Sequence, residues 1–189
     1  QYLLLLAYEG TPQAVEEMQN LAEKVPALAP AVYVELGKHY WRMKDPQQAL
    51  TFYNKATDLD PAYEDAYLGR AELFERTSNF FFMLREYEQL EKLGYQSADM
   101  YTRMGSVYLV GKDLENAQKY YQKAAQIDPG DVNANYFLAM LAEQRQDWPQ
   151  ALKYLQAAAD YNKNSGKWLQ ASFYQQKMGD SQAALDTLK

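Results

Sequence analysis

The chain has 189 residues, of which 48% are hydrophobic and 23% are charged, so it can form a folded core and is not a disordered chain. It contains no cysteine and a single histidine, which excludes disulfides, thiolate sites and any metal site that needs two imidazoles. The net charge of −6 argues against nucleic acid or an anionic membrane as the main partner.

The first residues include the longest wholly apolar run, Leu3–Ala7, which is far shorter than the roughly 20 residues of a membrane-spanning helix. We therefore predict no direct membrane insertion, and the sequence leaves cytoplasm and periplasm equally open. Strand signals are missing. Apolar residues instead recur at spacings of three and four, separated by short polar breaks, which predicts an all-α chain.

These helical segments repeat with a period of 34 residues. One large apolar position recurs at Tyr53, Tyr87, Tyr121 and Leu155. Four further columns have the same spacing, and one of them always holds a small residue: Gly37, Ala71, Gly105 and Ala139. A small side chain at this position lets a neighbouring helix approach closely. A fixed period of this length is the signature of a repeat architecture.

Each repeat is predicted to contain two helices joined by a short turn. Asp45, Asp113 and Asp147 lie between the two helices, where an aspartate can cap the second helix. Full repeats are predicted at 30–63, 64–97, 98–131 and 132–165, with partial repeats at 1–29 and 166–189. No Gly/Ser/Pro-rich linker interrupts them, so we predict one array over the whole chain.

The pattern resembles the tetratricopeptide repeat (TPR) family. The best-matching repeats carry Tyr33, Leu36, Gly37, Tyr40, Ala49, Tyr53, Ala56 and Pro61, and Tyr101, Met104, Gly105, Tyr108, Ala117, Tyr121, Ala124 and Pro129. The repeat at 64–97 departs from the pattern at Arg70, Met83 and Tyr95. The resemblance implies a right-handed superhelical solenoid of antiparallel helix pairs. It also implies a non-catalytic protein–protein interaction scaffold that binds a peptide or protein segment in its concave groove.

No sequence motif points to catalysis. The phosphate-binding, dinucleotide-binding, nucleophile-elbow and zinc-protease motifs are all absent. His39 has no nucleophile or partner constellation around it in sequence and is interpreted as a surface or partly buried helix residue. The acidic residues around Asp58 and Glu86 lack the spacing and the glycine of a calcium loop. We therefore predict no catalytic residue, no metal site and no cofactor.

The first helices of the repeats line the concave surface of such an array. On each first helix, the face next to the one that packs in the core is expected to point into the groove. The candidate partner-binding residues on this face are Lys38, Trp41, Arg42, Leu68, Glu72, Arg76, Arg103, Tyr136, Phe137, Met140, Leu169 and Phe173. The N-terminal half of this set is mixed in charge and the C-terminal half is apolar, which suits an amphipathic or extended partner segment. The alternative is that these side chains pack against second helices of neighbouring repeats.

One branch of the family binds the C-terminal carboxylate of heat-shock chaperones through a clamp of Lys, Asn and Arg residues. The matching positions here are Val34, Lys38, Gly69, Asp99 and Arg103. Only Arg103 fits the clamp, so the resemblance does not imply this particular function.

The segment Phe80–Met83 is unusual because one aromatic residue there is typical of the family. Phe81 and Phe82 are predicted to point toward the convex side, where they form a protein contact or a dimer seam. The alternative is local repacking around Met83, which replaces a small residue. Self-association is also predicted through the ends of the array, because no polar capping helix is found and the chain is expected to be a segment of a longer array.

Two other functional interpretations remain beside the scaffold. The array can be the substrate-recruiting arm of a larger enzyme, secretion or envelope-assembly protein. The aromatic groove also suggests a carbohydrate-handling envelope scaffold.

Overall fold

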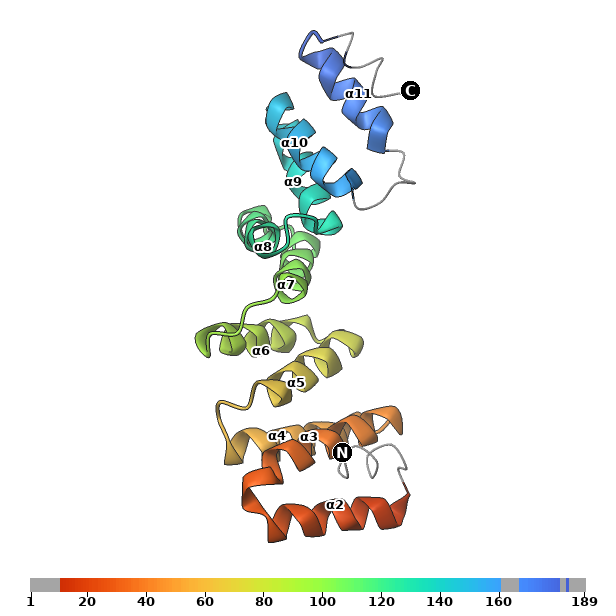
Figure 1. Cartoon of the computed structure of the whole chain (residues 1–189), viewed down its shortest axis with the longest axis vertical. Coiled ribbons are helices and arrows are strands. Elements are labelled where there is room, and N and C mark those ends of the chain that lie inside the picture. The colour runs from red at the N-terminus through yellow and green to blue at the C-terminus, as the bar shows by residue number, and fades with distance from the viewer. Residues whose placement is uncertain (1–10, 161–166, 181–182, 184–189) are drawn as a thin grey trace. The chain divides into compact units, whose positions relative to one another are not determined.

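A computed structural model describes residues 11–160, 167–180 and 183, and side-chain surroundings within residues 11–158, 170–180 and 183. The described part of the chain is helical and contains no strand, which confirms the predicted all-α class (Figure 1). Within these residues no helix combines the length and the apolar character that crossing a membrane requires.

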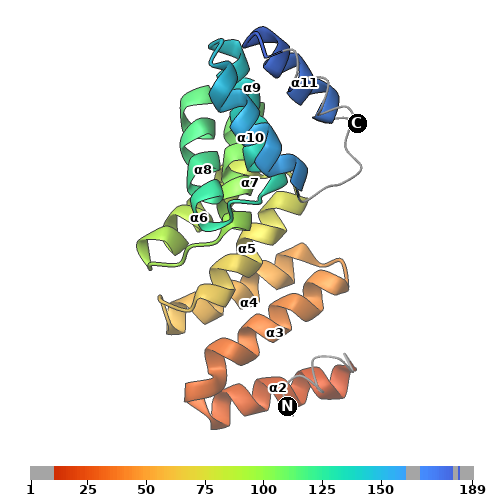
Figure 2. The ribbon, with the colours of Figure 1, turned by 45° about the horizontal axis from the view of Figure 1, so that its top comes forward.

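The helices follow the predicted repeats. In chain order they are α2 (Pro12–Lys24), the short 3-10 turn η1 (Pro26–Leu28), α3 (Ala29–Arg42), α4 (Pro46–Leu59), α5 (Glu64–Arg76), α6 (Phe80–Lys92), α7 (Ala98–Val110), α8 (Leu114–Ile127), α9 (Val132–Gln144), α10 (Trp148–Asp160) and α11 (Lys167–Lys177). Each predicted full repeat holds one helix pair, and Figure 2 shows the partners of a pair lying antiparallel.

The chain divides into two compact parts, an N-terminal block (Gln1–Tyr95) and a C-terminal block (Gln96–Lys189). The division falls two residues before the end of the second predicted full repeat, 64–97, which departs from the pattern. That all repeats form a single array stays a prediction.

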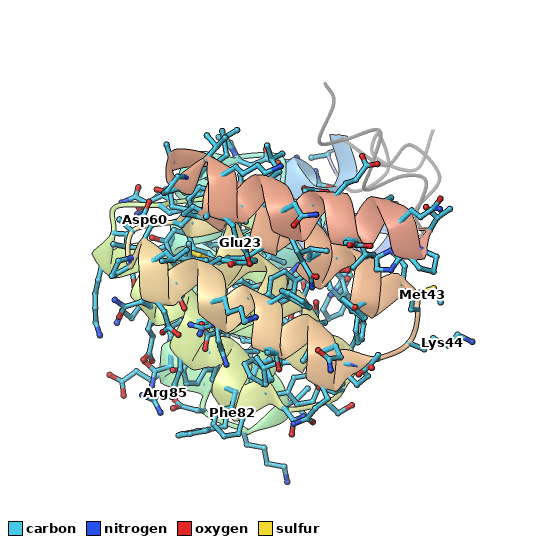
Figure 3. All side chains as sticks on the ribbon, turned by 90° about the horizontal axis from the view of Figure 1, so that it is seen from below. Glu23, Met43, Lys44, Asp60, Phe82 and Arg85 are labelled. Atoms are coloured by element: carbon cyan, nitrogen blue, oxygen red, sulfur yellow. The ribbon has the colours of Figure 1, made fainter. Side chains whose placement is uncertain are left out.

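The turn inside each helix pair has the same backbone conformation in all four full repeats. A residue other than glycine adopts a left-handed conformation, with φ between 58° and 61°, at Lys44, Ser78, Lys112 and Gln146. The next residue lies directly before the second helix, at its N-cap position, and the Asp45 carboxylate accepts a hydrogen bond from the Gln48 N–H at 3.0 Å. Asp113 and Asp147 cap α8 and α10 in the same way, which confirms the predicted caps. Figure 3 shows Met43 and Lys44 projecting from one such turn.

Close packing between repeats depends on Tyr53, which is 3% exposed. Its ring lies against Gly37 of α3 and Gly69 of α5, so that a Cβ atom on either glycine would lie 2.5 Å from Cε1 of the ring. The equivalent ring of Tyr121 lies 3.0 Å from the Cβ position of Gly105. At Gly37 and Gly105 the position is therefore small because an aromatic ring of the same repeat occupies the space that a side chain would need.

We predict that Gly37→Ala destabilises the N-terminal block. Overpacking costs about 1–3 kcal/mol, which exceeds the gain of up to about 1 kcal/mol from replacing a helical glycine. The Tyr53 ring cannot move away from Gly37 without meeting Gly69. Urea unfolding followed by circular dichroism measures the change.

Gly111→Ala is the matched control, because its new Cβ would meet only ordinary contacts at 3.5 Å. Adding Tyr53→Leu to Gly37→Ala should recover part of the lost stability. Equal stability of the Gly37→Ala protein and the parent would contradict the close contact.

Candidate functional site

The candidate residues of the N-terminal block lie along α3 and α5. Lys38 is exposed and its Nζ lies 2.8 Å from Glu35 Oε1, while Arg76 Nε lies 3.2 Å from Glu72 Oε1. Ion pairs of this exposed, helical kind contribute only about 0.3–0.5 kcal/mol each. These pairs therefore give the surface its mixed charge without fixing the fold.

Two apolar candidates of the same block are partly covered. Trp41 and Leu68 are half-buried, and Trp41 packs against the core cluster that contains Tyr53. Arg42, which follows Trp41, is exposed. In the other block, Arg103 donates from Nε to Asp99 Oδ2 at 2.7 Å, within α7.

The structure corrects the expectation that Phe137 is an exposed residue of the concave groove, because only 6% of its surface is accessible. Its ring lies 4.5 Å from the ring of Tyr121, measured between centroids. Tyr121 belongs to the second helix of the preceding repeat, and its hydroxyl lies 2.9 Å from Ser106 Oγ. The alternative interpretation, packing against a neighbouring repeat, therefore holds for Phe137. The side chain of Leu169 lies outside the described residues.

Three other apolar candidates in the C-terminal block are exposed. Tyr136 and Met140 are 39% and 41% accessible, and Phe173 is 41% accessible. Tyr136 and Met140 lie one turn apart on α9 and so share one face of that helix. We call Tyr136, Met140 and Phe173, with the polar group Glu143, Gln170 and Tyr174 beside them, the α9/α11 surface.

The polar group of the α9/α11 surface joins the two helices. The Tyr174 hydroxyl donates to Glu143 Oε2 at 2.7 Å, and Gln170 Nε2 donates to the same oxygen at 3.1 Å. Tyr174 is fully buried, and burial together with its hydrogen bond to Glu143 raises the pKa of its hydroxyl. The tyrosine therefore stays protonated and remains a donor to the carboxylate at neutral pH.

Phe173 is held at the rim of this group by aromatic and cationic contacts. Its ring packs edge-on against Trp148, with the centroids 6.2 Å apart, and Lys177 Nζ lies 5.2 Å from the ring centroid. These contacts cover part of the ring and leave the rest to solvent.

Two of the departures from the pattern in repeat 64–97, Arg70 and Met83, have a visible structural role. Arg70 of α5 donates from Nε to Glu86 Oε2 of α6 at 2.9 Å and from Nη1 to Asn54 Oδ1 of α4 at 2.9 Å. Met83, at the position where the family has a small residue, is fully buried. This supports local repacking as the role of Met83.

Phe81 and Phe82, in contrast, are exposed. They are 68% and 47% accessible, and Phe80 is 41% accessible. Phe82 leans on Phe74 of α5, with the ring centroids 5.2 Å apart. Figure 3 shows the side chains of Phe82 and Arg85 projecting from the same side of α6. We call Phe80, Phe81 and Phe82 the Phe patch.

The remaining chemistry of the described residues is sparse. His39 is 8% exposed and lies edge-on to the Tyr40 ring at 5.2 Å, and burial lowers the pKa of its imidazole. Among the residues that the structure describes, no group of three histidine, aspartate or glutamate side chains lies close enough to hold a metal ion.

Comparison with known proteins assigns the family. Family models described as tetratricopeptide repeat match residues 30–63, 84–132 and 111–172, which together cover more than half of the chain. The chain belongs to the tetratricopeptide repeat family. It is accordingly a protein–protein interaction scaffold of the TPR class, and the family resemblance seen in the sequence is confirmed.

Solved TPR structures share the fold. YrrB, described as a TPR protein with an unusual peptide-binding site, superposes with a TM-score of 0.69 at 19% identity, over 92% of this chain and 90% of that chain. A MamA structure superposes with a TM-score of 0.67 at 15% identity, over 86% and 89% of the two chains. At these identities the likeness concerns the fold alone.

The sequence relatives are larger proteins. Anaphase-promoting complex subunit 3 of Schizosaccharomyces pombe is 22% identical over 137 residues, which are 72% of this chain and 21% of that protein. RNA polymerase II-associated protein 3 of Xenopus tropicalis is 25% identical over 112 residues, which are 59% and 17%. The chain thus spans about a fifth of the length of the curated relatives it matches.

We predict that Glu86 makes the stability of this TPR chain depend on pH. Burial raises the pKa of the Glu86 carboxyl, and Arg70 opposes the rise only in part. A pKa that is raised by folding contributes stability below the ordinary value of about 4.3, and this contribution is lost as the pH rises through the folded-state pKa.

The measurement is the free energy of unfolding of the parent minus that of Glu86→Gln, from urea titrations between about pH 4 and pH 7. This difference should fall as the pH rises. Glu72→Gln, at an exposed carboxylate, supplies the background slope. A difference that increases with pH would show that the ion pair with Arg70 outweighs burial.

Proposed function

We propose that the C-terminal block binds a short segment of a partner protein on the α9/α11 surface. The observation that supports this most is the exposure of Tyr136, Met140 and Phe173 beside a hydrogen-bonded polar group. Side chains of this size are normally covered in a soluble protein, and aromatic residues dominate the binding energy where they lie in an interface.

The chemistry of the surface indicates the kind of segment. Met140 is unbranched and adapts to the shape of an apolar partner side chain. Glu143 lies three residues after Met140 and is held by Tyr174 and Gln170, so an acceptor is fixed at one end of the apolar stripe. An amphipathic segment with an apolar face and a donor at its end fits this arrangement.

Arg103 of the C-terminal block is proposed as a polar flank that selects the partner and does not hold it, whereas the binding role of Lys38, Arg42, Glu72 and Arg76 in the N-terminal block stays a prediction. The binding role of Trp41 and Leu68, which are half-buried residues of the same N-terminal block, also stays a prediction. Exposed charges of this type act mainly on association rate and discrimination.

The wider role follows from the family and the relatives. YrrB is described as having a peptide-binding site, and one relative is named as a subunit of the anaphase-promoting complex. These names support a non-catalytic array that holds a partner within a larger assembly. The alternative, a recruiting arm fused to a catalytic or membrane domain, is distinguished by the full reading frame.

The test uses peptides selected from a displayed random library with the whole chain as bait. We predict that Met140→Ala and Phe173→Ala each lower the affinity for the selected peptide at least about tenfold, which equals about 1.4 kcal/mol. Fluorescence anisotropy measures the affinity. Val110→Ala, at a 79% exposed residue of the same block, is the matched control and should bind normally. Equal binding by all three variants would exclude the α9/α11 surface.

We further propose that the Phe patch carries a self-contact between two copies of the chain. Three consecutive aromatic side chains, each at least 41% exposed, form the kind of apolar surface that soluble monomers avoid. The patch lies on α6 within the N-terminal block, away from the candidate residues of α3 and α5 in sequence.

Sedimentation velocity over a concentration series tests this self-contact. Phe81→Ser with Phe82→Ser should abolish concentration-dependent dimer formation, and the midpoint of thermal unfolding should change little because both rings are exposed. Leu114→Ser, at a 44% exposed residue of α8, is the control and should leave the dimer intact. A parent chain that stays monomeric at high concentration would rule out the contact.

A further inference from the structure

The second helices of the C-terminal block, α8 and α10, border a groove that is not part of the α9/α11 surface. Two adjoining hollows, of about 440 and 240 Å³, share Gln122, Leu138 and Tyr154 as lining residues. Gln122 comes from α8 and Tyr154 from α10, while Leu138 of α9 is buried and forms the floor. We call this the α8/α10 groove.

The groove lies on a different side of α9 from the α9/α11 surface. Leu138 follows Tyr136 by two residues, which places the two side chains about 200° apart around the helix. A ligand in the α8/α10 groove therefore meets none of the exposed side chains that carry the proposed function.

A row of glutamines forms one wall of the groove. Gln118, Gln122 and Gln126 are spaced by four residues along α8, so their side chains lie on one face of that helix. The row is about 12 Å long at 1.5 Å per residue. An extended chain of about four residues, at about 3.3 Å each, has the same length. Gln150 and Tyr154 line the opposite wall from α10.

Most polar groups of the groove have no protein partner among the described residues. The side-chain amides of Gln122, Gln126 and Gln150, and the Tyr154 hydroxyl, make no hydrogen bond there. By contrast, two polar residues at the margins of the groove already make hydrogen bonds within the protein. Gln118 accepts from Arg145 Nη2 at 2.8 Å, and Asn135 Nδ2 donates to the Pro129 and Asp131 carbonyls.

We propose that the α8/α10 groove binds a peptide segment of about four residues in extended conformation. A carboxamide both donates and accepts hydrogen bonds, as the peptide group does, so facing glutamines can pair with the main chain of an extended segment whatever its side chains. The apolar floor at Leu138 and the small walls at Ala125 and Ala157 leave room for one apolar side chain of the ligand.

Charge sets the direction of the bound segment. Lys153 lies at the Gln126 end of the groove and forms no salt bridge with a described carboxylate. At the other end Arg145 is bonded to Gln118, and Asp147 caps α10 through the Gln150 N–H. The positive charge of Lys153 therefore favours a ligand carboxylate, from an acidic side chain or a chain terminus, at this end of the groove.

The test titrates the whole chain with a library of N-acetylated hexapeptides that have free C-termini, and follows side-chain amide signals by nuclear magnetic resonance. Binding should shift the Gln122 and Gln126 amide signals. The double variant Gln122→Ala with Gln126→Ala should bind the best peptide at least tenfold more weakly than the parent does. The separate variant Ala157→Leu should show the same loss of affinity. Lys153→Gln should weaken acid-ended peptides and leave C-terminally amidated neutral peptides unchanged.

Controls separate this groove from the α9/α11 surface. Gln144→Ala, at an exposed glutamine of α9 outside the groove, and Met140→Ala should both bind the peptide normally. Unchanged circular dichroism of the double glutamine variant shows that folding is retained. The proposal fails if no hexapeptide shifts the glutamine signals, if the groove variants bind as the parent does, or if only oligosaccharides in a parallel titration give the shifts.

Discussion

The ring of Tyr53 lies between the backbones of α3 and α5, which belong to successive repeats. Because the Cβ positions of Gly37 and Gly69 both fall 2.5 Å from this ring, neither helix can carry a side chain there at its present distance. A single helix pair cannot bury its apolar face alone and depends on the next pair. The packing of the Tyr53 ring on the two glycines thus sets the distance between α3 and α5, and that distance decides which other side chains stay covered.

The repeat at 64–97, which contains Gly69, adds polar contacts to this packing at a position where it departs from the pattern. Arg70 lies one residue after Gly69 and ties Asn54 of α4 to Glu86 of α6. A half-buried ion pair of this kind gains little net stability, but breaking it by removing one partner is costly. This helix pair is therefore held both by the packing of Tyr53 on Gly69 and by polar contacts that require particular partners. Met83 fills the remaining space as an adaptable apolar side chain.

The period of 34 residues was sufficient to predict the helix pairs and the aspartate caps, because both depend on local sequence. It did not distinguish Tyr136 from Phe137, which are adjacent on α9 and about 100° apart. Only the position of Tyr121 on the preceding repeat shows that Phe137 is covered. The bonds from Gln170 and Tyr174 to Glu143 depend in the same way on how α11 packs on α9. In repeat 64–97 the departures at Arg70, Met83 and Tyr95 were the only sign in the sequence of a different packing. The spacing of residues along the sequence cannot predict which face of a helix its neighbours cover.

Helix α9 explains how one block can offer two surfaces. Its sequence is apolar on nearly every side, and a helix of that kind is normally covered all round. Here α8 and α10 cover it only in part: Leu138 forms the floor of a groove, while Tyr136 and Met140 remain exposed on another side. The two surfaces therefore share a rigid helix but no side chain. A ligand on one surface can affect the other through a movement of α9, which the bonds from Tyr174 and Gln170 to Glu143 oppose, or through α10, whose Trp148 packs on Phe173.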